Sequence, residues 1–579
     1  MVVLSMIRDY ASNSTAHGLP KLAKARSARG KVFWTLICFS ALCFLLILGT
    51  SLLRKYYAYP KSVRLELANQ PIPFPAVSLC NLRPVDVYTI WKAIFNESGE
   101  RQWDIGEDFD YDGRDPPDAD TSIFESHLIR FANNFKSYQS YSDIKSEKDP
   151  IKLWKMEREL LSRMTMIGNL NLTAAQQGGV QKEQFIAKCE YGGEHCTAKN
   201  FSLFQDPAYL NCYTFNLSKN LDSIYEGPDN GLSVVLFVPG PSIMGQDMDK
   251  AADIALHQEL SLGGEGVRVV IHEQNTVPYP LTEGLDIPRG VSASVAIKLI
   301  ENDRLGPPHG NCTDKKTIDG FIKYSYTMAS CKKTCLQKLV METCNCGDVS
   351  LPIWNTNLTL CTKFDELPAE CQGRENITRN IAHCEVLFDE WFQRVGCTKS
   401  TKANISKNLS AWTECDCMPR CHDTEYSLFY SLSDWPMQEQ QRDVVQELLY
   451  VDRFIHNFPP EKQKQYFGSI DVRNSSPTYD DYRTFVEQKN LIRLNIYISD
   501  TSVVKIMETE AYSLTHLASD IGGQLSLWIG VSIITMVEII ELIWGMIKIC
   551  AAGTNKTKEE EKVNGTDMEK QKMNYGDEV

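Results

Sequence analysis

The stretch IGGQLSLWIGVSIITMVEIIELIWGMIKICAA, residues 521–552, decides how this chain folds. It is apolar and long enough to cross a bilayer as a helix. Its interior nevertheless carries Glu538 and Glu541, and a charge at mid-depth costs roughly 2.5–3.5 kcal/mol on insertion scales. The apolar part before them, residues 525–537, is too short to cross alone. The fold therefore has to give both carboxylates polar surroundings inside the membrane.

Water is the surrounding that the sequence favours, because the run holds no Lys or Arg before Lys548. Glu538 and Glu541 are three residues apart and share one side of a helix with Thr535. A side that faces a hydrated pathway satisfies both carboxylates and attracts cations. Since two helices cannot enclose such a pathway, we expect several copies of the chain to surround it and favour a channel over a transporter.

Glycines interrupt the same run at two places. Gly530-Val531-Ser532 either permits close helix packing or breaks the helix, so that backbone carbonyls line a constriction. Gly522-Gly523 is a second candidate flexible point near the outer end.

A second apolar run, residues 32–53, spans about 33 Å as a helix and is predicted to be the first transmembrane helix. The cations before it place that end in the cytosol, with only Asp9 opposing them: Arg8, Lys21, Lys24, Arg26, Arg29 and Lys31. We therefore expect residues 1–31 in the cytoplasm, residues 54–520 outside, a second transmembrane helix at 521–551 and a cytoplasmic tail at 552–579. Residues 576–579 end in Val, which either fits a PDZ domain or is a chance feature of a disordered end.

The composition narrows the class of protein further. The chain has 579 residues, which is too long for one ordinary domain. Its net charge of −14 argues against a nucleic-acid partner. Neither H-E-x-x-H nor G-x-S-x-G occurs, and the ten histidines follow no ligand spacing. We expect no metal site, no cofactor and no enzymatic activity.

Cysteines and sequons agree with an outside location for the middle of the chain. Of 19 cysteines, Cys38, Cys43 and Cys550 lie in or at the apolar runs, and the other 16 lie between Cys80 and Cys421. An even number there indicates disulfides, with zinc binding the weaker alternative. Candidate glycosylation sites are Asn96, Asn171, Asn200, Asn216, Asn311, Asn357, Asn376, Asn404, Asn408 and Asn474. The presumed cytosolic tails also carry the motif, at Asn13, Asn555 and Asn564, so it is compatible evidence only.

Hydrophobic patterns predict an α+β domain between the two runs. Strands are expected around residues 63–67, 231–238, 266–274 and 491–499, where the last alternates Ile492, Leu494, Ile496 and Ile498 with polar residues. Residues 439–455 have helical spacing, 121–180 suggest mixed helix, and the Asp-rich 104–120 suggests a loop. Residues 312–421 form a cysteine-rich subdomain.

These motifs resemble the epithelial sodium channel/degenerin superfamily, which includes acid-sensing and FMRFamide-gated channels. The likeness rests on D-I-G-G-Q-L-S-L-W-I-G-V-S with E-I-I-E, and on five further motifs: His17-Gly18, F-P-A-V-S-L-C-N (74–81), C-Y-T-F-N (212–216), E-T-C-N-C (342–346) and C-D-C-M-P-R-C (415–421). They occur in the family's order over nearly the whole chain.

The resemblance implies a homotrimer or heterotrimer of two-span subunits with a hand-like extracellular domain, in which 312–421 is the thumb, passing sodium. Gly530-Val531-Ser532 is then the selectivity filter, with Glu538 and Glu541 as pathway carboxylates below it. Ser519, Asp520, Gly522 and Gly523 belong to the gate and amiloride-binding region, with Ser519 at the degenerin position. His17-Gly18 belongs to a cytoplasmic pore loop.

The family's cysteine order implies eight disulfides. The expected pairs are Cys80–Cys212, Cys189–Cys196, Cys312–Cys421, Cys331–Cys417, Cys335–Cys415, Cys344–Cys371, Cys346–Cys361 and, from the two cysteines left over, Cys384–Cys397.

Three residues depart from the family's pattern. Val531 is bulkier than the usual middle residue of the filter, which puts sharp selectivity for sodium over potassium or calcium in doubt. Lys61 follows Tyr59-Pro60 where acid-sensing channels carry His, and Lys does not titrate between pH 5 and 8. His309 stands where those channels have the Trp whose contact with Tyr59 links the thumb to the membrane part. This contact is either altered or pH-sensitive here, or His309 is merely a solvated surface residue.

The departure at Lys61 and the acidic ectodomain favour gating by an extracellular FMRFamide-like peptide, since a basic amidated peptide is steered towards negative charge. Proton gating, through acidic groups such as those of residues 108–115, and constitutive or mechanical opening are the alternatives. An ATP-gated channel and an adhesion receptor explain fewer of the motifs. The expected location is the plasma membrane, with two spans and both termini cytoplasmic.

Overall fold

The computed structural model describes residues 2–84, 137, 168, 172–218, 221–223, 225–239, 264–318, 321–353, 358–363, 368–372, 374–407, 415–448, 453–467 and 489–548. Two compact units divide the chain. The helical unit comprises Met1–Val63, Pro307–Gly310 and Glu508–Val579, and the mixed α/β unit comprises Arg64–Gly306 and Asn311–Met507. The expected loop at 104–120 and the tail at 552–579 lie outside the described residues, as does nearly all of 121–171.

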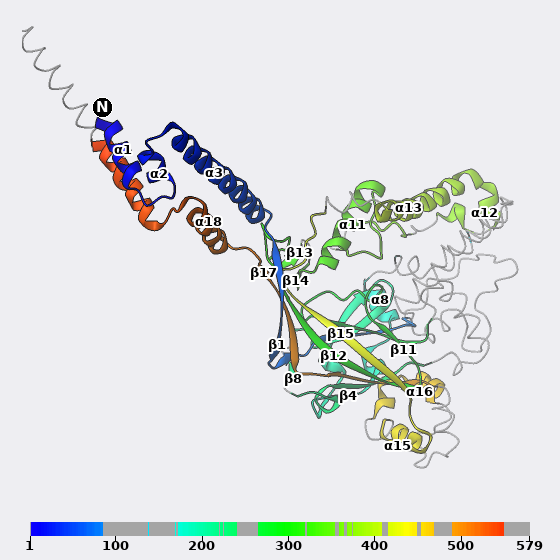
Figure 1. Ribbon diagram of the computed structural model, residues 1–579. Helices are drawn as coiled ribbons and strands as arrows, with labels where there is room; N and C mark the ends of the chain where they lie inside the picture. Colours follow the sequence, from blue (N-terminus) through cyan, green and yellow to red (C-terminus); the bar gives the residue numbers. More distant parts are fainter. Residues whose placement is uncertain are drawn as a thin grey trace, which may run out of the picture. The chain divides into compact units, whose positions relative to one another are not determined.

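The helical unit holds the two apolar runs. Its helices are α1 (Val2–Asn13), α2 (Leu19–Lys24), α3 (Ala28–Tyr57), α18 (Leu514–Ile529) and a further segment, Ile533–Lys548, which we call the C-terminal half-helix (Figure 1). The Ser27 side chain caps α3 by accepting a hydrogen bond from the Gly30 N–H. Thus α3 begins four residues before the predicted span at 32–53 and ends four residues after it.

Among the described residues, α3 is the one helix that is long and apolar enough to cross a membrane by itself. The predicted second transmembrane helix at 521–551 is not a single helix. It starts earlier, at Leu514, and α18 and the C-terminal half-helix meet at a bend of 77°. The predicted helix break at Gly530–Ser532 is therefore present, while the constriction lined by its carbonyls stays a prediction. The helix α18 continues through Gly522 and Gly523, which are therefore not a second break.

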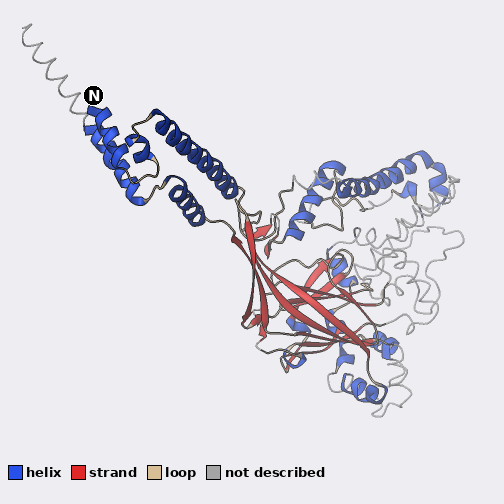
Figure 2. Ribbon diagram, in the orientation of Figure 1, coloured by secondary structure: helices blue, strands red, loops and turns tan. Residues whose placement is uncertain are grey.

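Two sheets form the mixed α/β unit (Figure 2). The larger sheet has the order β1-β17-β12-β16-β9-β4-β5, with β15 also paired to β12. Its strands are β1 (Lys61–Asn69), β4 (Ile186–Tyr191), β5 (Glu194–Cys196), β9 (Leu232–Phe237), β12 (Val291–Asp303), β15 (His422–Asp434), β16 (Leu491–Ile498) and β17 (Ser502–Glu510). The smaller sheet has the order β11-β10-β3-β7-β6, from β3 (Ala76–Asn81), β6 (Phe201–Asp206), β7 (Leu210–Phe215), β10 (Gly266–His272) and β11 (Leu285–Pro288).

Shorter elements complete the unit. They are the pairs β2 (Ile72–Pro73) with β8 (Asp222–Ser223) and β13 (Thr317–Ile318) with β14 (Phe321–Ser325), and the helices α8 (Leu172–Gly178), α9 (Lys182–Phe185), α11 (Met328–Cys344), α12 (Arg374–Arg379), α13 (Ile381–Lys407), α15 (Gln441–Gln446) and α16 (Pro460–Phe467). Single 3₁₀ turns are η1 (Ala198–Asn200), η2 (Pro228–Asn230), η4 (Ala369–Cys371), η5 (Gln438–Gln440) and η7 (Phe454–Asn457).

The core lies where the two sheets pack face to face. Apolar residues of β3, β7 and β10 join those of β12 and β16 in one buried cluster. The alternation predicted for β16 is confirmed, since Ile492, Leu494, Ile496 and Ile498 are all buried whereas Arg493 is exposed. All four predicted strands exist. In the range 439–455 the described residues form η5, α15 and the start of η7, and residues 449–452 of the expected helix lie outside the described residues.

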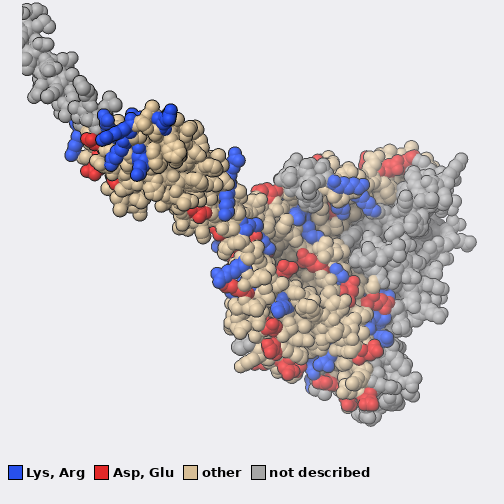
Figure 3. All heavy atoms as spheres, viewed as in Figure 1, with Lys and Arg blue, Asp and Glu red and all other residues tan. Residues whose placement is uncertain are grey.

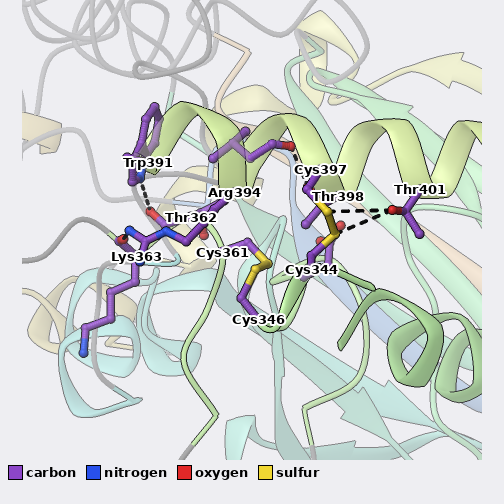
Figure 4. Close-up of a disulfide and its surroundings, with 12 residues drawn as sticks. Cys344, Cys346, Cys361, Thr362, Lys363, Trp391, Arg394, Cys397, Thr398 and Thr401 are labelled. Carbon is purple, nitrogen blue, oxygen red and sulfur yellow. Dashed lines mark hydrogen bonds between the residues drawn. A yellow bond between two sulfur atoms is a disulfide. The ribbon is translucent and has the colours of Figure 1, made fainter. Parts of the chain in front are cut away.

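Disulfides join strands of the sheets as well as the helical part of the mixed unit. Six bonds match the expected pairs: Cys80–Cys212, Cys189–Cys196, Cys312–Cys421, Cys331–Cys417, Cys335–Cys415 and Cys346–Cys361. The expected pairs Cys344–Cys371 and Cys384–Cys397 are wrong. The structure instead joins Cys344 to Cys397, as Figure 4 shows. It joins Cys371 to Cys384.

The helix α13 explains this correction. Cys384 and Cys397 lie on it 13 residues apart, which places them about 20 Å apart along its axis. A disulfide needs Cα atoms within about 7 Å, so the two cannot pair while α13 is intact. The signal was present in the sequence, because Cys384, Phe388, Trp391 and Val395 follow helical spacing and all four are buried.

Candidate functional site

The break between α18 and the C-terminal half-helix is encoded by Gly530. This residue ends α18 with φ = 65°, a left-handed conformation that glycine adopts without steric cost. The Gly530 N–H then donates to the Ser526 carbonyl at 3.1 Å, and the Val531 N–H donates to the Leu525 carbonyl at 3.2 Å. These bonds satisfy carbonyls at the end of α18, as expected for a helix closed by an αL glycine.

Ser532 and Thr535 start the next helix. The Ser532 hydroxyl accepts from the Thr535 N–H at 3.4 Å, and the Thr535 hydroxyl accepts from the Ser532 N–H at 3.2 Å. This reciprocal arrangement is a capping box with Thr in place of the usual Glu or Gln. The chain therefore leaves one helix and enters the next within three residues.

The His17-Gly18 segment packs directly against this break. The His17 N–H donates to the Ile529 carbonyl at 2.8 Å, which satisfies another carbonyl at the end of α18. A Cβ atom at Gly530 would collide with the His17 ring, so a side chain is excluded there by space as well as by φ. Gly18 has φ = 84°, and a Cβ on it would lie 2.6 Å from the Cys38 Sγ in α3. The predicted pore loop and the predicted filter are thus brought together.

The same segment contacts Glu538. Its Oε2 accepts from the Thr15 N–H at 3.2 Å, the Thr15 hydroxyl at 3.3 Å and the Ser14 hydroxyl at 3.4 Å. These donors compensate in part for the loss of water around the carboxylate. Water alone was predicted to surround the carboxylates, and the roles of Ser14 and Thr15 were not predicted from the sequence. The Glu541 side chain is exposed in the single chain, and no described residue donates a hydrogen bond to it.

At the other end of α18, Asp520 is held by a residue that the sequence did not single out. Its Oδ2 accepts from the Tyr512 hydroxyl at 2.7 Å, and the Lys55 ammonium lies 4.4 Å from the centre of the Tyr512 ring. Ser519 precedes Asp520 on the same helix. A Cβ added to Gly522 or Gly523 would meet nothing within 4 Å, so a single chain leaves the space beside these glycines open.

Tyr59, Lys61 and His309 all belong to the helical unit. The rings of Tyr59 and His309 are 5.2 Å apart at 79°, an edge-to-face contact, so His309 takes the place of an aromatic partner. The His309 Nδ1 is 4.0 Å from the Glu510 carboxylate. Lys61 forms an ion pair with Glu508 at 2.6 Å. Neither glutamate was identified from the sequence.

The sequons fall into three groups. Asn311, Asn376 and Asn404 are exposed and Asn200 is half-buried, which is compatible with glycans. Asn216 is a correction, because its side chain is buried and its amide donates to the Phe74 carbonyl at 2.6 Å, which leaves no room for a sugar. Five sequons lie outside the described residues: Asn96, Asn171, Asn357, Asn408 and Asn474.

Charge is distributed unevenly over the helical unit. Lys and Arg gather around α2 and the start of α3, as Figure 3 shows, and an apolar stretch separates them from Arg54 and Lys55. The described residues contain no group of three or more His, Cys, Asp or Glu side chains that would hold a metal ion.

An apolar helix, a broken apolar segment with carboxylates beyond the break, and a disulfide-stapled α/β domain define a membrane protein of the ion-channel class. The sequence model of the amiloride-sensitive sodium channel family matches residues 10–542. The chain belongs to this family of membrane-embedded sodium channels and is not an enzyme.

Relatives extend over most of the chain. It is 27% identical to the FMRFamide-activated amiloride-sensitive sodium channel of Cornu aspersum, over 93% of this chain and 83% of the relative. It is 23% identical to the epithelial sodium channel subunit alpha of Neoceratodus forsteri, over 93% and 79%. The degenerin unc-8 of Caenorhabditis elegans is 27% identical over 63% of this chain and 39% of its own length.

Proposed function

We propose that three copies of this chain form an amiloride-sensitive, sodium-permeable channel of the plasma membrane. The single observation that carries the proposal is Glu538, which lies two helical turns beyond the break at Gly530 and is bound by the chain's own N-terminal segment. A carboxylate held beside a helix break in a membrane-embedded family is suited to attracting cations to a constriction.

In this proposal α3 is one span, and α18 with the C-terminal half-helix is the other. Both termini lie in the cytosol, because the basic residues gather before α3. Trp34 and Tyr56 support the placement of α3. They lie near its two ends, about 33 Å apart along the axis, and aromatic residues of this kind favour the two membrane interfaces.

The pathway residues keep the roles that the resemblance implies. Gly530, Val531 and Ser532 form the selectivity filter, while Glu538 and Glu541 form rings of negative charge once three copies assemble. Ser519 to Gly523 contain the gate and the amiloride site. Because Val531 is bulky, we expect weaker discrimination between sodium and potassium than small residues at this position give.

The opening stimulus in this proposal is an extracellular amidated peptide of the FMRFamide type. Two observations support it: the relative activated by such a peptide matches 93% of the chain, and Lys61 is paired with Glu508 at a position where acid-sensing channels carry His. The contact of His309 with Tyr59 and Glu510 favours proton gating as the second candidate, because His309 forms an ion pair with Glu510 only in its protonated state.

Expression in oocytes under voltage clamp tests the proposal. Amidated peptides, acid steps and amiloride are applied in turn, with surface labelling of the protein as a check. A peptide-evoked, amiloride-blocked sodium current is the expected result. A current evoked by acid alone would identify protons, and not a peptide, as the opening stimulus. The absence of sodium current under every condition, with the protein at the cell surface, refutes the proposal that the protein is a channel.

Neutralising the pathway carboxylates tests their role in the same recordings. Glu538→Gln and Glu541→Gln should each lower the single-channel conductance or the selectivity, because they remove negative charge from the ion path. Glu375→Gln is the matched control, since Glu375 is an exposed residue of α12. Unchanged permeation in both pathway variants would place these carboxylates away from the ions.

A further inference from the structure

The hydroxyl of Thr535 links two segments that are more than 500 residues apart in the sequence. Its Oγ1 lies 2.7 Å from the Thr15 Oγ1, and the Thr15 Oγ1 lies 3.3 Å from the Glu538 Oε2. Thr535 is fully buried. A buried hydroxyl normally uses its hydrogen-bonding capacity, so this geometry is a defined network and not a chance approach.

The direction of the protons in this network follows from the chemistry of each group. The Ser532 N–H can only donate, so the Thr535 oxygen accepts from it. The single proton of the Thr15 hydroxyl goes to the carboxylate, so in the 2.7 Å contact the Thr535 hydroxyl donates to Thr15, and the Ser532 hydroxyl, 3.3 Å away, donates to Thr535. The carboxylate Oε2 accepts, so the Thr15 hydroxyl donates to Glu538. Every donor therefore points the same way, from the Ser532 backbone through Thr535 and Thr15 to Glu538. Bonds aligned in this manner strengthen one another.

A capping box alone does not require this arrangement. The Ser532–Thr535 pair would start the C-terminal half-helix without any contact to Thr15. Thr15 is an exposed residue of a separate segment, yet both its hydroxyl and its N–H converge on one oxygen of Glu538. The hydroxyl of Thr535 is what joins the helix cap to that carboxylate.

We propose that Thr535 is a positioning residue of the ion pathway: acting through Thr15, it fixes the Glu538 carboxylate at a set place relative to the helix break. This inference rests on the function proposed above. It makes residues 14–17 a working part of the permeation path, because without Thr15 the carboxylate keeps only the Ser14 hydroxyl of its three donors. Thr535 itself need not touch an ion.

Removal of the hydroxyl tests the proposal. Thr535→Val keeps the shape of the side chain, and Thr535→Ser keeps the hydroxyl. We expect the sodium-to-potassium permeability ratio, from reversal potentials, to change by about two- to tenfold in Thr535→Val, in line with the loss of one hydrogen bond. Thr535→Ser should restore the ratio to within about twofold of the unmodified channel. A wild-type ratio in Thr535→Val overturns the inference.

Thr15→Val supplies an independent arm that leaves the capping box intact. It should change the same ratio in the same direction, and the double variant should differ little from the stronger single variant, since both act in one network. Effects that multiply independently contradict the proposal. Thr50→Val is the matched control, because the Thr50 hydroxyl bonds only to the Ile47 carbonyl of its own helix at 2.8 Å. If Thr535→Val does not reach the surface, Thr15→Val still decides the question.

Crosslinking separates this inference from the proposed function. Thr15→Cys with Thr535→Cys, in a chain whose Cys38, Cys43 and Cys550 are Ser, should form a disulfide under mild oxidation that mass spectrometry detects. A wild-type chain without sodium current defeats the channel even if the crosslink forms. A conducting wild type whose double-cysteine variant shows no crosslink defeats the positioning role alone.

Discussion

His272 is the last residue of β10, and its surroundings favour the neutral form of its side chain. Its Nε2 lies 2.9 Å from the Ser78 hydroxyl, and its Nδ1 lies 3.0 Å from the Thr276 hydroxyl. Burial lowers the pKa of His272 from 6.5 to about 4. Burial also raises the pKa of Asp206, at the end of β6, from 3.8 to about 6. The two groups therefore bind protons differently in the folded and unfolded chain over the same pH range.

Their effects on stability have opposite signs. Between pH 4 and 6.5 His272 is neutral in the folded chain and charged in the unfolded chain. Its contribution to the free energy of unfolding is therefore largest above pH 6.5 and falls by about 3 kcal/mol as the pH drops to 4. Asp206 keeps its proton when folded, so its contribution declines by a similar amount as pH rises from 3.8 to 6. In the unmodified protein the two terms largely cancel in this range.

Single variants should expose each term. Relative to the unmodified protein, the melting temperature of His272→Gln should fall as pH rises from 4 to 6, because only the Asp206 term remains. Asp206→Asn should show the reverse. Thermal unfolding of the purified protein at pH 4, 5 and 6 measures both, with exposed His195→Gln as control. Identical pH profiles in all four proteins would show that neither group titrates as its burial implies.

At the scale of elements, α13 determines how the cysteine-rich part is stapled. Cys384, in its first turn, reaches Cys371 in η4, and Cys397, farther along the helix, reaches Cys344 at the end of α11. The Thr401 hydroxyl lies 3.5 Å from the Cys344 sulfur, one helical turn beyond Cys397, as Figure 4 shows. Each bond therefore ties a different part of α13 to its surroundings.

The two bonds should differ in their effect on stability. Cys344–Cys397 closes a separation of 53 residues and Cys371–Cys384 one of 13, for which chain entropy gives about 4 and about 3 kcal/mol. Replacing both cysteines of a pair by Ser should therefore lower the melting temperature more for Cys344 and Cys397. Peptide mapping of unreduced protein checks the pairing, and a peptide joining Cys384 to Cys397 would contradict it.

Elements with strong periodicity were predictable from the sequence, and elements set by distant contacts were not. The alternation of apolar residues predicts the strand β16, and the continuous apolar run predicts the helix α3. The capping box at Ser532 and Thr535 was not predicted, because Thr stands where the usual signature has Glu or Gln. The helix α13 was not predicted, because the family's cysteine order implied a pairing that takes no account of the helical apolar spacing between Cys384 and Cys397.

For the whole molecule, the contacts between the two ends of the chain could not be predicted from the sequence. That His17 lies against Gly530, and Thr15 against Glu538, depends on contacts more than 500 residues apart in the chain. The carboxylates in an apolar run predicted that polar groups must surround them. Whether water or the chain's own hydroxyls would do so was beyond reach, because no local pattern specifies a long-range hydrogen bond.

The number of copies around the proposed pathway is testable through Glu538. If each copy contributes one carboxylate to a ring, co-expression of the unmodified chain with Glu538→Gln in equal amounts mixes both kinds within one channel. A closed ring of three then gives four compositions, with none, one, two or three substituted copies. Single-channel recordings should accordingly fall into four conductance classes, in which the two mixed classes are about three times as frequent as the two pure ones. Five classes would indicate four copies, three classes would indicate two, and two classes would mean that the chains do not mix.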